Sequence, residues 1–235
     1  MKPSAIHPRV DQIGELTRGL SLPLDPIDGD HLQVIAEGLS RAFQEIQQAW
    51  PAIVATGSEA EVTALLVARL NSLIDHDIFW GQLVMCVVRG AESSSADASH
   101  IEKRPDLSIY LSSHRRNFPL IAEAKILDST KTEGMYCNNG LSRFLTGEYA
   151  WARQEAFMVG YVRDGSSIET RLLPFLKADM ATVPSRYAVE VPPTSAGGSI
   201  GDLAKSRHGR KFTYSHQTPL KHTPGSIDIW HLWLA

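Results

Sequence analysis

The sequence predicts an α/β fold in which a central mixed β-sheet is flanked by helices. Three observations predict this class. Two amphipathic segments of helical length precede residue 75, apolar segments of strand length follow between residues 78 and 163, and a helical segment separates the last two strands. Counted from the second helix, the order is helix, three strands, helix and strand, with a C-terminal β extension. Such an order favours a layered α/β domain.

The N-terminal region is expected to be irregular over residues 1–28, which contain four prolines. A first helix is expected over residues 30–50, where apolar residues recur at helical spacing. A second amphipathic helix is expected over residues 58–74. We therefore expect residues 1–54 to pack as a segment on a main domain formed by residues 55–235.

The core strands share a short apolar composition, and they are expected at residues 78–88, 107–111, 118–127 and 156–163. The first two should pair as a hairpin across the polar loop 90–103, and the third should lie beside them. A helix over residues 140–154 should lead into the last of these strands. This arrangement places the third and fourth strands in the middle of the domain.

The C-terminal part is expected to contain a helix, a short strand, a flexible connection and a closing strand, at residues 168–180, 186–191, 192–198 and 226–234. Pro174 should break the helix, because proline has no amide hydrogen to donate. The closing strand alternates apolar and polar residues, which is typical of a strand with two different faces.

Two carboxylates and a lysine interrupt the apolar strands. Asp106 follows Pro105 directly before residues 107–111, and Glu123 and Lys125 lie within the next strand. Because side chains alternate along a strand, Glu123 and Lys125 share one face. Charges on a central strand are costly unless they are used or paired. Carboxylate oxygens are ligands that Mg²⁺ prefers, so we expect Asp106 and Glu123 to hold Mg²⁺ against a phosphodiester, with Lys125 beside the attacking water.

Pro105-Asp106 and Glu123-Ala124-Lys125 together resemble the motif of the PD-(D/E)xK nuclease superfamily, and a looser resemblance covers about residues 55–165. The resemblance implies a restriction-endonuclease-like α-β-β-β-α-β core. It also implies that Asp106, Glu123 and the Ala124 carbonyl bind Mg²⁺, with Mn²⁺ as a substitute. The implied activity is endonucleolytic cleavage of DNA, with RNA as a second substrate class, and restriction or antiviral defence is the implied role.

The helix at residues 58–74 carries two further acids near its start. Glu61 and Ser58 match a capping box, in which the glutamate reaches back to the N-cap amide. Glu59 falls near the middle of the apolar stripe, and the resemblance implies that such an acid reaches the metal site. The alternative is that Glu59 only complements the helix N-terminus. Of the two, Glu59 is the candidate catalytic acid.

A basic segment lies between Asp202 and Asp228, where the sequence contains no acid and five cations: Lys205, Arg207, Arg210, Lys211 and Lys221. Histidines 208, 216 and 222 lie in the same segment without the spacing of a zinc site. Aromatic residues are interleaved, as in surfaces that bind phosphates and stack on bases. We expect this segment to contact nucleic acid. The alternative is a solvated hairpin whose cations balance acids elsewhere.

Arg143, in the helix expected over residues 140–154, is a further candidate for contact with a phosphate. A guanidinium group can bind phosphate through two hydrogen bonds. An ordinary surface arginine is the alternative.

The composition is that of a soluble globular protein, with 43% hydrophobic and 21% charged residues. Cys86 and Cys137 are too few for a disulfide scaffold, and reduced thiols suit the cytoplasm. The N-terminus has no apolar signal segment, and no stretch has the length of a membrane span. A net charge of −3 favours a local basic surface over a global one.

Three classes of protein remain open on these observations. The first is the metal-dependent nuclease. The second is a catalytically idle nucleic-acid-binding module on the same fold, and the third is a regulatory or assembly protein in which the motif is coincidental. Sequence specificity, the activating signal and the formation of a homo-oligomer are also left open.

Overall fold

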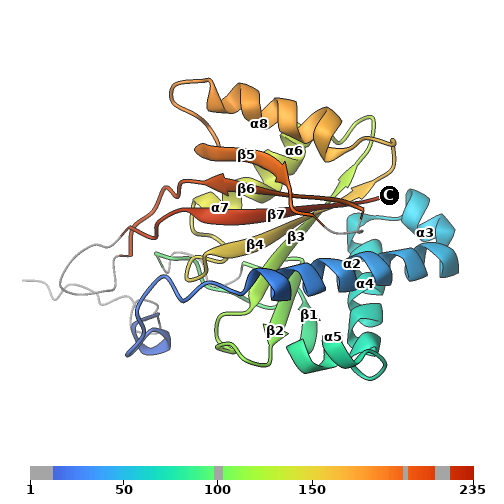
Figure 1. Cartoon of the computed structure of the whole chain (residues 1–235), viewed down its shortest axis with the longest axis horizontal. Coiled ribbons are helices and arrows are strands. Elements are labelled where there is room, and N and C mark those ends of the chain that lie inside the picture. Colours follow the sequence, from blue (N-terminus) through green and yellow to red (C-terminus); the bar gives the residue numbers. More distant parts are fainter. Residues whose placement is uncertain (1–12, 98–102, 198–200, 215–222) are drawn as a thin grey trace, which may run out of the picture.

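The computed structural model describes residues 13–97, 103–197, 201–214 and 223–235. A seven-stranded mixed sheet in the order β1-β2-β3-β4-β7-β6-β5 forms its centre (Figure 1). The strands are β1 (Val84–Arg89), β2 (Leu107–Leu111), β3 (Leu120–Leu127), β4 (Glu155–Val162), β5 (Val189–Ser195), β6 (Asp202–His208) and β7 (Ile227–Leu234). Strands β3, β4 and β7 are parallel, and the other pairs are antiparallel. The predicted α/β class and mixed sheet are confirmed.

Helices cover both faces of this sheet (Figure 1). The first group is α2 (Gly29–Ala49), α3 (Pro51–Thr56), α4 (Glu59–Ile74) and α5 (Ile78–Leu83). The second group is α6 (Glu133–Tyr136), the π-helical turn η1 (Cys137–Leu141), α7 (Ser142–Leu145), the π-helical turn η2 (Ile168–Leu172) and α8 (Leu173–Met180). Two apolar clusters, one on each face of the sheet, form the main core.

Strand β3 contributes to both clusters because its side chains alternate between the two faces. Ala122, Ala124 and Ile126 lie in the cluster with α2 and α4, and Ile121 and Leu127 lie in the other cluster. A fully buried aliphatic side chain stabilises a fold by about 1.5–3 kcal/mol. The two charged residues of β3 therefore occupy positions that a purely structural strand would fill with apolar side chains.

Several predicted elements are confirmed within one or two residues: the helices at 30–50 and 58–74 and the strands at 107–111, 118–127, 156–163 and 226–234. The capping box at the start of α4 is also present. Glu61 Oε2 accepts from the Ser58 amide at 2.7 Å, and Ser58 Oγ accepts from the Glu61 amide at 3.3 Å. Cys86 and Cys137 are free thiols, as expected.

The prediction of a strand over residues 78–88 was wrong for the first half of this segment. Residues 78–83 form helix α5, and β1 begins only at Val84. Asp77 accepts from the Trp80 amide at 2.8 Å and thereby starts a helical turn. The buried indole of Trp80 then donates to the Leu70 carbonyl at 2.9 Å. Short apolar segments do not distinguish a strand from a helix by periodicity alone.

The helix expected over residues 140–154 was also wrong in its bounds. Helical structure begins earlier, at Glu133, and ends at Leu145. Gly147 adopts a φ of 79°, a conformation that favours glycine, and the amides of Glu148 and Tyr149 donate to the Arg143 carbonyl at 2.9 and 3.2 Å. The chain therefore turns back toward the sheet instead of continuing as a helix.

The strand expected at 186–191 lies at 189–195, so the segment predicted as a flexible connection is largely part of β5. Pro192 and Pro193 are tolerated there because β5 is the edge strand of the sheet. Strand β6 was missed, because Lys205 and Arg207 were interpreted as part of a basic segment. Pro174 does not break the helical region 168–180. It lies in the first turn of α8, where the missing amide hydrogen costs little.

None of the helices formed by the described residues has the length and apolar composition needed to cross a membrane.

Candidate functional site

The candidate site lies where β3 loses one of its two neighbouring strands. Strand β4 pairs with β3 as far as Leu127, but β2 pairs with it only as far as Ala122, so beyond Ala122 no described strand lies opposite the edge of β3 that faces away from β4. Two carboxylates take the place of the missing strand. Asp106 Oδ2 accepts from the Ala124 amide at 2.9 Å, and Glu59 Oε2 accepts from the Ile126 amide at 3.2 Å. The two acids are thus fixed at the open edge of β3.

Backbone contacts position the segments that carry these acids. Arg163 holds the chain before α4, because its guanidinium donates to the carbonyls of Val54 and Gly57 at 2.9 and 2.7 Å. At the start of β2, the Pro105 carbonyl accepts from the Gly90 amide at 3.2 Å. Both acids therefore sit directly next to backbone that is anchored to the ends of core strands.

Lys125 joins these acids into one cluster. Its Nζ atom lies 3.0 Å from Glu59 Oε1 and 3.0 Å from Glu123 Oε1. The same atom lies 3.4 Å from Asp106 Oδ2 and donates to the Ala124 carbonyl at 2.6 Å. The structure thus brings together every residue predicted for the metal-binding and catalytic positions. We call Glu59, Asp106, Glu123 and Lys125 the carboxylate cluster.

Glu123 is the most deeply buried member of the carboxylate cluster. Its side chain is 2% exposed, and Oε2 has no hydrogen-bond partner among the described residues. Burial and the negative charge of Asp106 raise the pKa of Glu123 to about 7, although Lys125 and Arg143 oppose this shift. A carboxyl group with this pKa is partly protonated at neutral pH.

The neighbouring carboxylates determine the charge state of Lys125. Burial alone would lower the pKa of Lys125, but the charges of Glu123, Asp106 and Glu59 outweigh burial and raise this pKa above its ordinary value. The sequence left the charge state open. In this arrangement Lys125 is an ammonium ion at neutral pH.

Arg143 extends the cluster on the side of the second helix group. Its Nη1 atom donates to Glu123 Oε1 at 3.0 Å and to the hydroxyl of Tyr149 at 2.8 Å. The guanidinium also lies over the Tyr149 ring, 5.4 Å from its centroid. Burial and the charge of Glu123 raise the pKa of Tyr149 to about 12. Arg143 is therefore part of this site and not an isolated surface residue.

Tyr149 is a site residue that sequence analysis missed, because its position depends on the turn at Gly147. A Cβ atom at Gly147 would lie 2.8 Å from Phe212 and 2.9 Å from Ala96. We expect Gly147→Ala to lower the free energy of unfolding by about 1–3 kcal/mol, through the positive φ and the close contacts. Urea denaturation measures this loss.

Gly165→Ala is the matched control for that substitution. Gly165 has a φ of 71°, similar to that of Gly147, but a Cβ atom there would meet no atom within 4 Å. The loss should therefore be smaller than at Gly147. Equal losses would show that the contacts around residue 147 contribute nothing.

The basic segment does not join the carboxylate cluster. Strands β4 and β7 separate β6, which carries Lys205 and Arg207, from β3. Lys205 lies 3.5 Å from Asp228, and Arg207 lies 3.6 Å from Glu190 and 3.7 Å from Asp228. In these ion pairs the cations of a β-hairpin balance nearby acids. This is the alternative that the sequence left open.

The other cations of this segment contact backbone. Lys211 Nζ donates to the Arg186 carbonyl at 2.5 Å. Arg210 donates to the carbonyls of Trp151, Arg153, Pro224, Gly225 and Ser226. Lys221, His216 and His222 lie outside the described residues.

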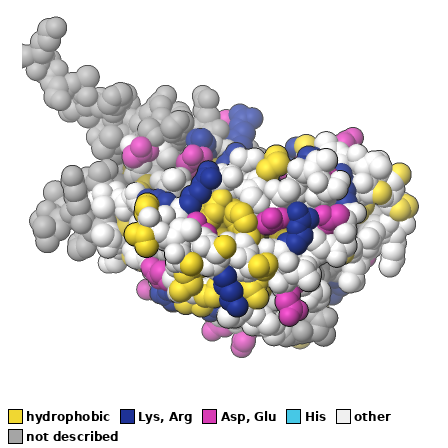
Figure 2. Space-filling view, turned by 90° about the horizontal axis from the view of Figure 1, so that it is seen from above, with side chains coloured by type: hydrophobic (Ala, Val, Ile, Leu, Met, Phe, Trp, Pro, Cys, Tyr) yellow, Lys and Arg dark blue, Asp and Glu magenta, His cyan; other side chains and the backbone are white. Residues whose placement is uncertain are grey.

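On the face drawn in Figure 2, the described acidic and basic side chains are intermixed with hydrophobic ones and are not segregated by charge. Nucleic-acid contact by the basic segment stays a prediction.

The donor atoms of the carboxylate cluster are oxygens, but they do not surround an empty metal position. Among the described residues, no group of three or more His, Cys, Asp and Glu side chains is arranged to hold a metal ion. Oxygens of Asp106, Glu123 and Ala124 instead converge on the ammonium of Lys125. These oxygens are of the kind that Mg²⁺ prefers, and Glu123 Oε2 is unpartnered within the described structure. The donor atoms therefore match Mg²⁺ in chemical type, while in this structure those of Asp106, Ala124 and Glu123 Oε1 contact the ammonium of Lys125.

Comparison with known proteins adds no relative: no family model matches the chain, and no curated protein or solved structure matches it. The resemblance to the PD-(D/E)xK superfamily therefore rests on the motif residues and stays a prediction.

Proposed function

We propose that this protein is a metal-dependent nuclease that hydrolyses phosphodiester bonds in DNA, with its active site at the carboxylate cluster. The observation that carries the proposal is the convergence of three carboxylates and one backbone carbonyl on Lys125 Nζ, at the open edge of a central strand. By analogy with the superfamily, the proposed reaction is endonucleolytic, and restriction or antiviral defence is the proposed role.

The charge of the cluster supports a requirement for a divalent cation. Glu59, Asp106 and Glu123 carry three negative charges when ionised, and Lys125 and Arg143 carry two positive charges, so one net negative charge remains. Such a cluster repels a phosphodiester. A bound divalent cation would reverse the sign of the net charge and let an anionic substrate approach.

Each residue then has a distinct part in the proposed mechanism. Mg²⁺, held by Asp106, Glu123 and the Ala124 carbonyl, would supply Lewis-acid polarisation of the phosphoryl group and a more acidic water. Lys125, released from Asp106 and Glu123, donates hydrogen bonds to the phosphoryl oxygen that gains charge in the transition state. Glu59 keeps its contact with the β3 edge and positions Lys125. Arg143 is close enough to Glu123 to share contact with the same phosphate.

Cleavage of supercoiled plasmid DNA tests the proposal. We expect nicked and linear products with Mg²⁺ and none with EDTA. Lys125→Ala and Asp106→Asn should each lower the cleavage rate by at least about a hundredfold, because each removes a group that acts on the transition state. Circular dichroism and melting of each variant, with assays well below the melting temperature, separate lost chemistry from lost structure. A labelled RNA of matched length tests the second substrate class.

Lys177→Ala is the matched control, because Lys177 is an exposed lysine on α8, outside the cluster. Its cleavage rate should equal that of the wild type. Cleavage that persists in EDTA, or that is equal in Lys125→Ala and wild type, would overturn the proposal.

A catalytically idle nucleic-acid-binding module is the second candidate. The observation that favours it is the position of Lys125, whose ammonium already engages all three carboxylates. Retention of DNA on the wild-type protein in a filter-binding assay, without cleavage in any divalent metal, would favour this second candidate.

A further inference from the structure

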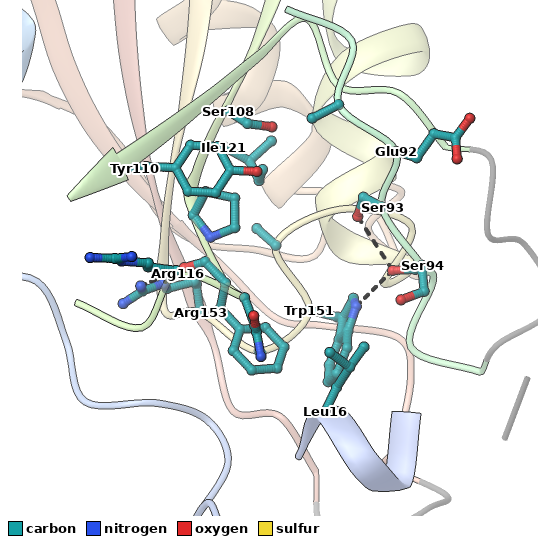
Figure 3. A pocket seen from close by; sticks show the side chains of 16 residues that line it. Leu16, Glu92, Ser93, Ser94, Ser108, Tyr110, Arg116, Ile121, Trp151 and Arg153 are labelled. Carbon is teal, nitrogen blue, oxygen red and sulfur yellow. Dashed lines mark hydrogen bonds between the residues drawn. The ribbon is translucent and has the colours of Figure 1, made fainter. Parts of the chain in front are cut away.

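A pocket of about 440 Å³ is lined in part by residues of β2 and β3 (Figure 3). This volume is within the usual range of small-molecule sites. Ser108 of β2 and Ile121 of β3 are cross-strand partners and form part of its lining. Asp106 lies two residues before Ser108, and Glu123 lies two residues after Ile121. At a rise of about 3.3 Å per residue, this part of the lining is about 7 Å along the strands from the cluster.

Positive charge collects at one side of this pocket, where the side chains of Arg116 and Arg153 lie together (Figure 3). Arg153 is 2% exposed, and its Nε and Nη2 atoms both donate to the Phe118 carbonyl. Burial lowers the pKa of Arg153 to about 10, which reflects the cost of a buried cation.

Among the described residues, neither Arg116 nor Arg153 forms an ion pair with a carboxylate, although the charge of Glu155 offsets part of the charge of Arg153. The acid that lines the pocket, Glu92, is paired with Arg104 at 2.7 Å. The pocket therefore has an excess of positive charge, which suits an anionic group.

Aromatic and polar side chains line the rest of the pocket. Tyr110 and Trp151 provide rings, and Ser108 and Asn117 provide a hydroxyl and an amide. The Trp151 indole is held in place by a hydrogen bond to the Ser94 carbonyl at 2.7 Å. A cationic side and an aromatic, hydrogen-bonding side together suit a ligand that has a phosphate and a flat polar ring.

We propose that this pocket binds one nucleotide of the DNA strand beside the phosphodiester that is cut, with the phosphate toward Arg116 and Arg153 and the base toward Tyr110 and Trp151. This inference rests on the proposed nuclease function. A base enters such a pocket only when it is unpaired. The nuclease is therefore expected to prefer single-stranded DNA or duplexes with unpaired bases near the cut.

Isothermal titration calorimetry with the four deoxynucleoside 5′-monophosphates tests the pocket directly. The titrations use the full chain in EDTA, so that no cleavage is involved, with inorganic phosphate and the matching deoxynucleosides as fragments. We expect saturable binding of at least one monophosphate, tighter than that of either fragment. Arg116→Ala should weaken binding about tenfold, the effect of one charge-assisted contact. Arg116 is exposed, so this variant keeps the fold.

Arg115→Ala is the matched control. Arg115 is the exposed neighbour of Arg116 and lines a different pocket, so its loss should leave the affinity unchanged. Absence of saturable binding to the wild type would overturn the proposal. Equal weakening by both arginine variants would also overturn it, as would phosphate binding as tight as nucleotide binding.

Asp106→Asn separates this inference from the proposed function. Asp106 does not line the pocket, so the variant should bind nucleotides as the wild type does while its cleavage is lost. A wild type that binds nucleotides but cuts no DNA would retain the pocket and remove the nuclease proposal.

Discussion

Lys125→Met is expected to lower the free energy of unfolding by about 3–5 kcal/mol at pH 8, because it removes the cation shared by three carboxylates. The methionine side chain keeps most of the length of lysine but carries no charge. Glu123, with a side chain only 2% exposed, would keep Arg143 as its remaining cation. Urea denaturation of the wild type and the variant, both in EDTA, measures the difference.

This loss should be smaller in acid. The pKa of Glu123 is about 7 in the folded protein, against an ordinary value of 4.5, and removal of Lys125 raises it further. A carboxyl group with a raised folded pKa binds more protons in the folded state than in the unfolded state over that window. Its destabilising effect is therefore absent below pH 4.5 and grows as the pH rises through the folded pKa. The deficit of Lys125→Met should accordingly be much smaller at pH 5 than at pH 8.

Two further variants make the comparison specific. Glu123→Gln in the Lys125→Met background removes the buried charge and should recover most of the stability lost at pH 8. Lys177→Met, at an exposed position of α8, should change stability by no more than about 0.5 kcal/mol. A deficit of the same size at pH 5 and pH 8 would show that packing, and not unpaired charge, explains the effect.

The predictable part of the site was the part encoded by local spacing. Glu123 and Lys125 are two residues apart on a strand, and strand geometry alone puts them on one face. The Ser58–Glu61 capping box is also local, and its presence left Glu59 as the acid free to turn toward β3. Where apolar residues recur over many turns, as in α4, the element was predicted correctly.

The parts that could not be predicted depend on contacts between distant segments. The role of Asp106 as a partner of the Ala124 amide follows from where β2 begins, a feature of strand pairing that one sequence does not reveal. Tyr149 reaches Arg143 only because the chain turns at Gly147. The pocket lined by Arg116 and Trp151 likewise combines residues of β2 and β3 with loop residues that are far apart in the sequence.

A second large effect is expected from a buried chain of hydrogen bonds on the other side of β4. Tyr136 donates to the Met158 carbonyl at 2.9 Å and contacts His231 Nδ1 at 3.0 Å. Ser206 Oγ lies 2.7 Å from the Nε2 atoms of both His231 and His208. His208 Nδ1 then meets the carbonyl of Tyr187 at 2.8 Å. Both imidazoles are fully buried.

The number of hydrogen atoms available to this chain of hydrogen bonds is relevant to whether one of its imidazole rings is charged. With both imidazoles neutral, the side chains of Tyr136, Ser206, His208 and His231 supply one hydrogen each, whereas the chain has five contacts. Protonation of one ring would supply the missing hydrogen. One hydrogen bond contributes about 0.5–1.5 kcal/mol, whereas burial of an ion costs several kcal/mol. The cost of burying an ion exceeds the gain from one hydrogen bond, so both imidazole rings stay neutral near pH 7.

The contribution of His208 to stability should consequently fall in mild acid. Burial lowers the pKa of His208 from 6.5 to about 4, and nearby acids such as Asp179 offset this only in part. Between these values the unfolded state binds more protons than the folded state, so stability is lost as the pH falls from about 6.5 toward 4. From this pKa shift, His208 alone should lower the free energy of unfolding by about 2 kcal/mol between pH 7.5 and pH 5.

Urea denaturation of His208→Gln at both pH values tests this result. The variant is expected to be less stable than the wild type at pH 7.5, because it disturbs the buried hydrogen bonds, but its change in stability from pH 7.5 to pH 5 should be about 2 kcal/mol more favourable than that of the wild type. His76→Gln, at an exposed histidine, should show the same change as the wild type. An equal change in His208→Gln and the wild type would mean that His208 does not resist protonation in the folded protein. The change of the free energy of unfolding with pH reports proton uptake, whereas its value at one pH also depends on packing.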